Sequence, residues 1–168
     1  MRKRGIRVDL VLPTRHILPL AFEEMAQKTV LHELFKRLAV DVVERVKQAP
    51  GTGAITLWDF NDVYPEIALD PVPPEGSTEA AKYFYEASHY NLIVGSAMSA
   101  TIMGKTSPFP GFGKELTRAN LETQIATVRA RLKDWMDTHP QELALLKERT
   151  EAKIRCSRME ASKMKAGH

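Results

Sequence analysis

Hydrophobic residues in the first sixty positions follow the periods of a strand, a long helix and a second strand. Residues 6–12 (IRVDLVL) are rich in β-branched and aliphatic side chains and end at Pro13, which predicts a buried strand. From about Leu20 to Gln48, apolar residues recur at spacings of three and four, which predicts an amphipathic helix. Residues 54–60 (AITLWDF) predict the second strand. A strand–helix–strand unit places its two strands parallel in one sheet.

The long helix is predicted to have one apolar side and one charged side. The aliphatic residues of this pattern are Val30, Leu31, Leu34, Leu38, Val42, Val43 and Val46. The charged residues between them are Glu33, Lys36, Arg37, Asp41, Glu44 and Lys47.

The remainder of the chain predicts loops and helices. Residues 61–76 form a proline-rich loop, and long loops in compact domains are usually functional or mobile. Helices are predicted from about Asn91 to Met103, from a cap at Thr117 to about Thr138, and again from Pro140. We expect residues 1–104 to form a partial α/β domain and residues 105–168 to form a helical extension with a basic tail.

Two predicted strands are too few for a stable open sheet, which normally has about four to six strands. We therefore expect a protein partner or self-association to complete the sheet, or the chain to be a segment of a larger domain. The composition, 43% hydrophobic and 27% charged over 168 residues, is typical of a globular domain. Basic residues gather at both ends, where solvated tails are the simplest explanation; nucleic-acid binding is not expected.

Several classes of protein are not supported by the sequence. Cys156 is the only cysteine, which excludes an internal disulfide bond. No stretch approaches the roughly 18 apolar residues that span a bilayer. Because no signal peptide is recognised, we expect a cytoplasmic location, or an envelope-associated one if the sequence belongs to a longer protein. No metal-ligand cluster or glycine-rich phosphate loop is present, so no cofactor is predicted.

The most informative chemistry lies in an aromatic segment, where Glu86 precedes His89 by three residues. A histidine held by a nearby acid can take a proton from a hydroxyl group near neutral pH. This spacing therefore predicts a general base with its orienting acid. The alternative is a histidine that caps a helix or fills an aromatic pocket.

Two further residues follow the predicted strands and could line a site. Asp59 lies at the carboxyl end of the second strand, and ligands of open α/β sheets gather at such ends. Its alternative role is to cap the following turn. His16 lies just past the first strand and either approaches a ligand or is an ordinary surface histidine.

No serine has the context of a nucleophile. The Gly-x-Ser-x-Gly elbow is absent. Ser77 lies in a polar loop without a preceding strand, and Ser96 lies inside a predicted helix. A general base without its nucleophile loses most of the catalysis, so the chain alone is expected to be inactive.

The order of these motifs resembles the carboxy-terminal half of bacterial SGNH hydrolase-like proteins, most closely their cell-envelope branch. The resemblance covers roughly residues 5–138: a strand followed by PTRH (13–16), a long helix, a strand ending in WDF (58–60), a proline-rich loop and YEASHY (85–90). It implies a partial flavodoxin-like α/β/α sandwich with few parallel strands, in which His89 matches the catalytic base. Glu86 stands where the family has an aspartate. The family's serine block and its oxyanion glycine and asparagine blocks have no counterpart.

The resemblance implies a truncated or split relative of esterases and acyltransferases that act on O-acyl groups of carbohydrates. A carbohydrate ester is expected as the substrate on this ground alone. The alternative function is a non-catalytic α/β interaction protein that binds a protein partner or an anionic surface.

Overall fold

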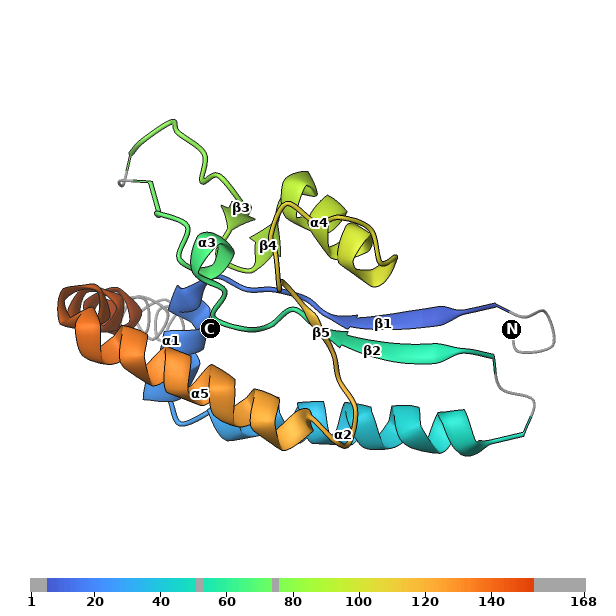
Figure 1. Cartoon of the computed structure of the whole chain (residues 1–168). Helices are drawn as coiled ribbons and strands as arrows, with labels where there is room; N and C mark the ends of the chain where they lie inside the picture. Colours follow the sequence, from blue (N-terminus) through green and yellow to red (C-terminus); the bar gives the residue numbers. More distant parts are fainter. Residues whose placement is uncertain (1–5, 51–52, 74–75, 153–168) are drawn as a thin grey trace, which may run out of the picture. The chain divides into compact units, whose positions relative to one another are not determined.

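The computed structural model describes residues 6–50, 53–73 and 76–152; Cys156 and most of the basic tail lie outside them. The chain forms two compact units, Met1–Leu132 and Lys133–His168. Figure 1 labels the helices and strands. In chain order these are β1 (Val8–Leu12), α1 (Ile17–Met25), α2 (Thr29–Gln48), β2 (Ile55–Asp59), α3 (Pro65–Ala68), β3 (Phe84–Glu86), β4 (His89–Tyr90), α4 (Leu92–Ile102), β5 (Lys114–Glu115) and α5 (Leu121–Thr138).

Three strands form a small mixed sheet in the order β1-β2-β5. β1 and β2 are parallel, with Leu10 opposite Leu57, and β5 runs antiparallel to β2. Because α1 and α2 connect β1 to β2, the predicted strand–helix–strand unit is confirmed and the fold is mixed α/β. β5 has only two residues, too few for hydrophobic periodicity to predict it.

The helix predicted from about Leu20 to Gln48 is interrupted and forms two helices. Residues 26–28 separate α1 from α2, and Gln27 has a φ of 55°. This left-handed conformation cannot continue a right-handed helix. α1 also begins earlier than predicted, at Ile17, because the side chain of His16 caps its first turn.

Helix α2 turns two of its charged residues inward and most of its large apolar residues outward. Glu33 and Lys36 are only 5% exposed, and Val40 and Val43 complete the buried side. The outward residues are between 48% and 64% exposed, and we call them the α2 stripe: Val30, Leu31, Leu34, Phe35, Leu38 and Val42. The inward charges are tolerated because each is paired, Glu33 with Arg129 and Lys36 with Asp59.

Hydrophobic clusters cover both faces of the sheet within the first unit. Figure 1 shows α2 on one side of the β1–β2 pair and α4 on the other. The cluster between α2, β2 and the start of α5 consists of Val40, Val43, Leu57, Leu116, Leu121 and Ile125. The cluster under α4 is largely aromatic and consists of Phe60, Ile67, Tyr83, Phe84, Val94, Ala97, Met98, Phe109 and Phe112.

The second unit contains the end of α5 and a helix over residues 140–152, which begins at Pro140 as predicted. The Trp135 and His139 rings stack 4.8 Å apart, and the Thr138 hydroxyl donates to the Asp134 carbonyl. Across the described parts of the chain, no helix combines the length and hydropathy that crossing a membrane requires.

Candidate functional site

The Glu86–His89 pair forms in the structure, on a short hairpin of β3 and β4. One Glu86 carboxylate oxygen contacts Nδ1 of His89 and also accepts a 2.7 Å hydrogen bond from the Ser88 hydroxyl. The Ser88 hydroxyl and then the His89 ring lower the pKa of Glu86, so the carboxylate stays charged at neutral pH. The side chains of His89 and Glu86 are 78% and 55% exposed. Within the described residues, Nε2 of His89 has no hydrogen-bond partner.

Backbone contacts fix this hairpin beside the carboxyl end of β1. The N–H of His16 donates a 3.2 Å hydrogen bond to the Ala87 carbonyl, between the two strands of the hairpin. The His16 ring meets the Phe84 ring edge to face, with centroids 5.6 Å apart. Asn91 caps α4 with its side-chain oxygen and donates its amide to the Lys82 carbonyl. The pair therefore lies at the sheet edge where α/β proteins hold their ligands.

His16 itself is buried and structural rather than an ordinary surface histidine. Its Nδ1 accepts from the Leu18 N–H at 3.2 Å, and its Nε2 donates to the Asp70 carbonyl at 2.8 Å. With one ring nitrogen accepting and the other donating, the imidazole is neutral. Burial lowers its pKa further than the contacts with Asp70 raise it. His16 joins β1, α1 and the hairpin without presenting an open ring nitrogen.

Asp59 caps the turn after β2 and forms a buried ion pair. Its Oδ1 accepts from the Asn61 N–H at 3.0 Å, as the capping alternative predicts. Its Oδ2 lies 2.6 Å from Nζ of Lys36. Burial raises the pKa of Asp59, while Lys36 acts in the opposite direction. With both oxygens occupied, Asp59 supports the turn and is not available as a base.

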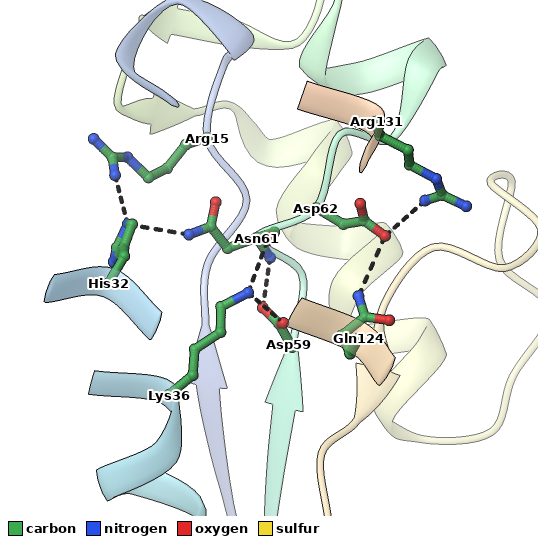
Figure 2. Close-up of polar contacts among 8 residues, drawn as sticks. All are labelled: Arg15, His32, Lys36, Asp59, Asn61, Asp62, Gln124 and Arg131. Atoms are coloured by element: carbon green, nitrogen blue, oxygen red, sulfur yellow. Dashed lines mark hydrogen bonds and ion pairs between the residues drawn. The ribbon is translucent and has the colours of Figure 1, made fainter. Parts of the chain in front are cut away.

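A polar network continues from this ion pair to α1 (Figure 2). Lys36 Nζ also donates to the Asn61 carbonyl at 3.1 Å. His32 Nε2 accepts from Asn61 Nδ2 at 3.2 Å and from Arg15 Nη1 at 2.7 Å. Arg15 in turn makes a bidentate pair with Glu23. Because two donors meet one ring nitrogen, that nitrogen carries no proton; burial is the main reason that the pKa of His32 is lowered.

The network borders a pocket between α1, α2 and α5. About 440 Å³ of empty space, part of it open to solvent, lies against Leu20, Glu23, Thr29, His32, Glu33, Lys36, Asn61, Ile125, Val128, Arg129 and Leu132. Each charged residue of the pocket wall is paired within the structure. Oγ1 of Thr29 and Oδ1 of Asn61 are buried without a partner. Such a pocket suits a few water molecules or a small neutral group.

A second polar group lies on the other side of Asn61. Asp62 accepts from Arg131 at 2.7 Å and from Gln124 at 3.3 Å (Figure 2). These contacts attach the turn after β2 to α5.

The sequence identified the Glu86–His89 pair, but not the network around Lys36 and His32. One signal was present: Thr29, His32, Lys36, Val40 and Val43 share one side of α2 at spacings of three and four. The two valines at the end of that row indicate that the whole row faces the core. In the structure, Asp59 bonds to Lys36 and Asn61 and so belongs to this network, and none of the bonds described for it reaches His89. Glu86 contacts His89, and His16 packs against the hairpin that carries them.

Among the residues that the structure describes, no group of three or more His, Cys, Asp and Glu side chains could hold a metal ion. No protein-family model, curated protein or solved structure matches this chain, so its function has to be inferred from the residues described above.

Proposed function

We propose that this chain supplies the proton-transferring part of an SGNH-type ester hydrolase or acyltransferase, and that another polypeptide segment supplies the nucleophilic serine. The observation that carries the proposal is the contact between the Glu86 carboxylate and Nδ1 of His89. A carboxylate on Nδ1 fixes the tautomer in which Nε2 is the unprotonated, basic nitrogen. The exposure of the His89 ring leaves that nitrogen open to an incoming hydroxyl group.

In the proposed reaction, Nε2 of His89 takes the proton from the serine hydroxyl as its oxygen attacks the carbonyl carbon of an O-acyl group. The same proton is then delivered to the departing sugar alkoxide, which leaves a serine ester and a free sugar hydroxyl. Glu86 stabilises the imidazolium between these two steps and keeps the ring oriented. The segment over residues 61–73, which contains α3, would shape the cleft for the carbohydrate.

A decisive experiment measures acetate release from an O-acetylated oligosaccharide in extracts of the cells that produce this protein. The chain is present as wild type, as His89→Ala or as His139→Ala, which removes a histidine outside the hairpin. General acid–base catalysis contributes about 10²–10⁴-fold, so His89→Ala is expected to reduce release by at least about 100-fold. His139→Ala is expected to have no effect. Equal release from the His89→Ala and His139→Ala extracts would exclude the proposed role.

A second candidate function, a non-catalytic α/β interaction protein, is favoured by a different observation. The α2 stripe exposes six large apolar side chains on one helix. A contiguous apolar surface of this kind usually marks an interaction site. If His89→Ala leaves acetate release unchanged and the α2 stripe is found to bind a partner protein, the interaction function replaces the catalytic one.

A further inference from the structure

A second pocket lies at the carboxyl end of β2, between the turn that follows this strand, the loop before β5 and α5. It comprises about 320 Å³ of empty space, part of it open to solvent. It shares no lining residue with the pocket beside His32, and its walls lie within the first unit. Ligands of α/β proteins gather at the carboxyl ends of parallel strands. We call this space the β2 pocket.

Two oxygen atoms of the pocket wall are buried and lack a hydrogen-bond partner among the described residues. Gln124 is 3% exposed, and its Nε2 donates to Oδ2 of Asp62 at 3.3 Å, which turns Oε1 away from Asp62. Arg131 donates to the same Oδ2, so Oδ1 of Asp62 is also free (Figure 2). Amide and carboxylate oxygens only accept hydrogen bonds, and buried acceptors are rarely left unpaired in folded proteins. The β2 pocket therefore favours an occupant that donates hydrogen bonds at two points.

The charges around the pocket determine which kind of donor fits. Asp62 is paired with Arg131. Asp59, which also lines the pocket, is paired with Lys36. Lys114 lines the pocket as well, and no carboxylate in the described part of the chain pairs with its ammonium group. The excess charge of the wall is thus positive, which opposes a cationic donor and attracts an anion. A hydroxyl group is the donor that fits beside an anionic group.

We propose that the β2 pocket binds a small hydroxy acid. Its hydroxyl groups donate to Oδ1 of Asp62 and Oε1 of Gln124, and its anionic group pairs with Nζ of Lys114. Tyr64 and Phe112 line the same space and supply an aromatic wall for the carbon chain of the ligand. The volume is at the lower end of the range of about 300–1,000 Å³ for ligand pockets, which limits the ligand to a small molecule. This site involves no contact of His89 and goes beyond the proposed function.

Titration of the ¹⁵N-labelled full chain with three small probes of equal carbon number tests the inference by NMR. D-Glycerate carries two hydroxyl groups and a carboxylate, glycerol lacks the charge, and propionate lacks the hydroxyl groups. We expect D-glycerate to shift the backbone amides of Asp62 and Lys114 and the side-chain amide of Gln124 in a saturable way. Propionate is expected to bind at least about tenfold more weakly, because it leaves both buried oxygens unpaired. Glycerol, which forgoes only an exposed ion pair, is expected to bind about three- to fivefold more weakly.

Two lysines provide a matched pair of variants. Lys114→Met removes the charge of the pocket at an exposed position, and Lys105→Met makes the same change in an exposed loop outside the pocket. Lys114→Met is expected to weaken D-glycerate binding about three- to fivefold, to the level of glycerol, whereas Lys105→Met should leave it unchanged. Gln124→Met, which replaces the amide with an unbranched side chain of similar length, is expected to weaken the binding of D-glycerate and glycerol alike.

The contrary outcomes each overturn the site. Absence of saturable shifts with all three probes would mean that only water occupies the β2 pocket. Equal affinities for D-glycerate and propionate would exclude hydroxyl recognition by Asp62 and Gln124. Equal losses of affinity in Lys114→Met and Lys105→Met would leave only a general attraction of anions to a basic chain. His89→Ala is expected to bind D-glycerate as the wild type does, so failure of the proposed function leaves this site intact.

Discussion

Nζ of Lys36 lies 2.6 Å from Oδ2 of Asp59, and both side chains are almost completely buried, at 7% and 0% exposure. Two charges removed from water attract each other strongly but lose their hydration, so such a pair stabilises little relative to apolar residues of the same size. Removing only one of the two side chains is strongly destabilising, because the remaining charge is then buried without a partner. Lys36 and Asp59 connect α2 to the carboxyl end of β2 and to the turn that follows it.

Lys36→Met is therefore expected to lower the free energy of unfolding by about 3–5 kcal/mol, because Asp59 loses its partner. The double variant Lys36→Met with Asp59→Leu is expected to recover most of that loss. Lys133→Met, the same change at an exposed helical ion pair with Asp137, should have little effect, because water already screens both charges. Urea unfolding monitored by circular dichroism measures all three. A double variant as unstable as Lys36→Met would contradict this account.

The orientation of α2 can be tested with two adjacent valines. Val42 is 48% exposed and Val43 is 1% exposed, although sequence periodicity places both on one apolar side. Val43→Asp buries an unpaired carboxylate and is expected to cost more than about 4 kcal/mol. Val42→Asp makes the same change in helix propensity at an exposed position. It is expected to lower the free energy of unfolding by about 0.5–1 kcal/mol. Similar losses of unfolding free energy in the two variants would mean that the α2 stripe is not exposed in solution.

The sequence predicted the parallel strand pair from local patterns, the hydrophobic periods of two strands with a helix between them, and the Glu86–His89 pair from a spacing of three residues. It did not predict the orientation of α2. Periodicity shows that a helix has an apolar side, but does not say whether that side meets its own sheet or another polypeptide. The inward side of α2 is set by Arg129 and Asp59, which are distant in sequence and become partners only in the folded chain.

Stability is expected to depend on pH through His16. Burial lowers the pKa of His16 below its ordinary value of 6.5, so the unfolded chain binds a proton more readily than the folded chain. The contribution of neutral His16 is fully present above pH 6.5 and is lost as the pH falls from there toward the folded pKa. For one titrating group, the free energy of unfolding changes by at most about 1.4 kcal/mol per pH unit.

His16→Asn keeps a side chain that can cap α1 but cannot ionise, so it is expected to flatten the decline of unfolding free energy below pH 6.5. His32, whose pKa burial also lowers, contributes in the same direction and remains in this variant. Ser88→Ala, which leaves both histidines in place, should retain the wild-type slope. Chemical unfolding at a series of pH values between 7.5 and about 5 provides the comparison. An unchanged slope in His16→Asn would show that His16 is not buried as described.

Two glycines of the loop before β5 provide a matched test of packing around Phe60. Gly111 and Gly113 both have positive φ angles, 77° and 85°. A Cβ atom at position 111 would meet open space, whereas one at position 113 would overlap the buried Phe60 ring. Gly111→Ala is expected to cost about 1–2 kcal/mol from backbone strain alone. Gly113→Ala is expected to cost about 1–3 kcal/mol more, because the ring must move within a packed core.

If the additional loss arises from the ring, a shorter side chain at position 60 should relieve part of it. Phe60→Leu removes the outer ring atoms that the new methyl group would meet. Gly113→Ala combined with Phe60→Leu is therefore expected to be less destabilised than the sum of the two single variants. Gly111→Ala combined with Phe60→Leu should be additive, because position 111 does not face the ring. Additivity in both pairs of variants would place the strain of Gly113→Ala in the backbone and not in the contact with Phe60.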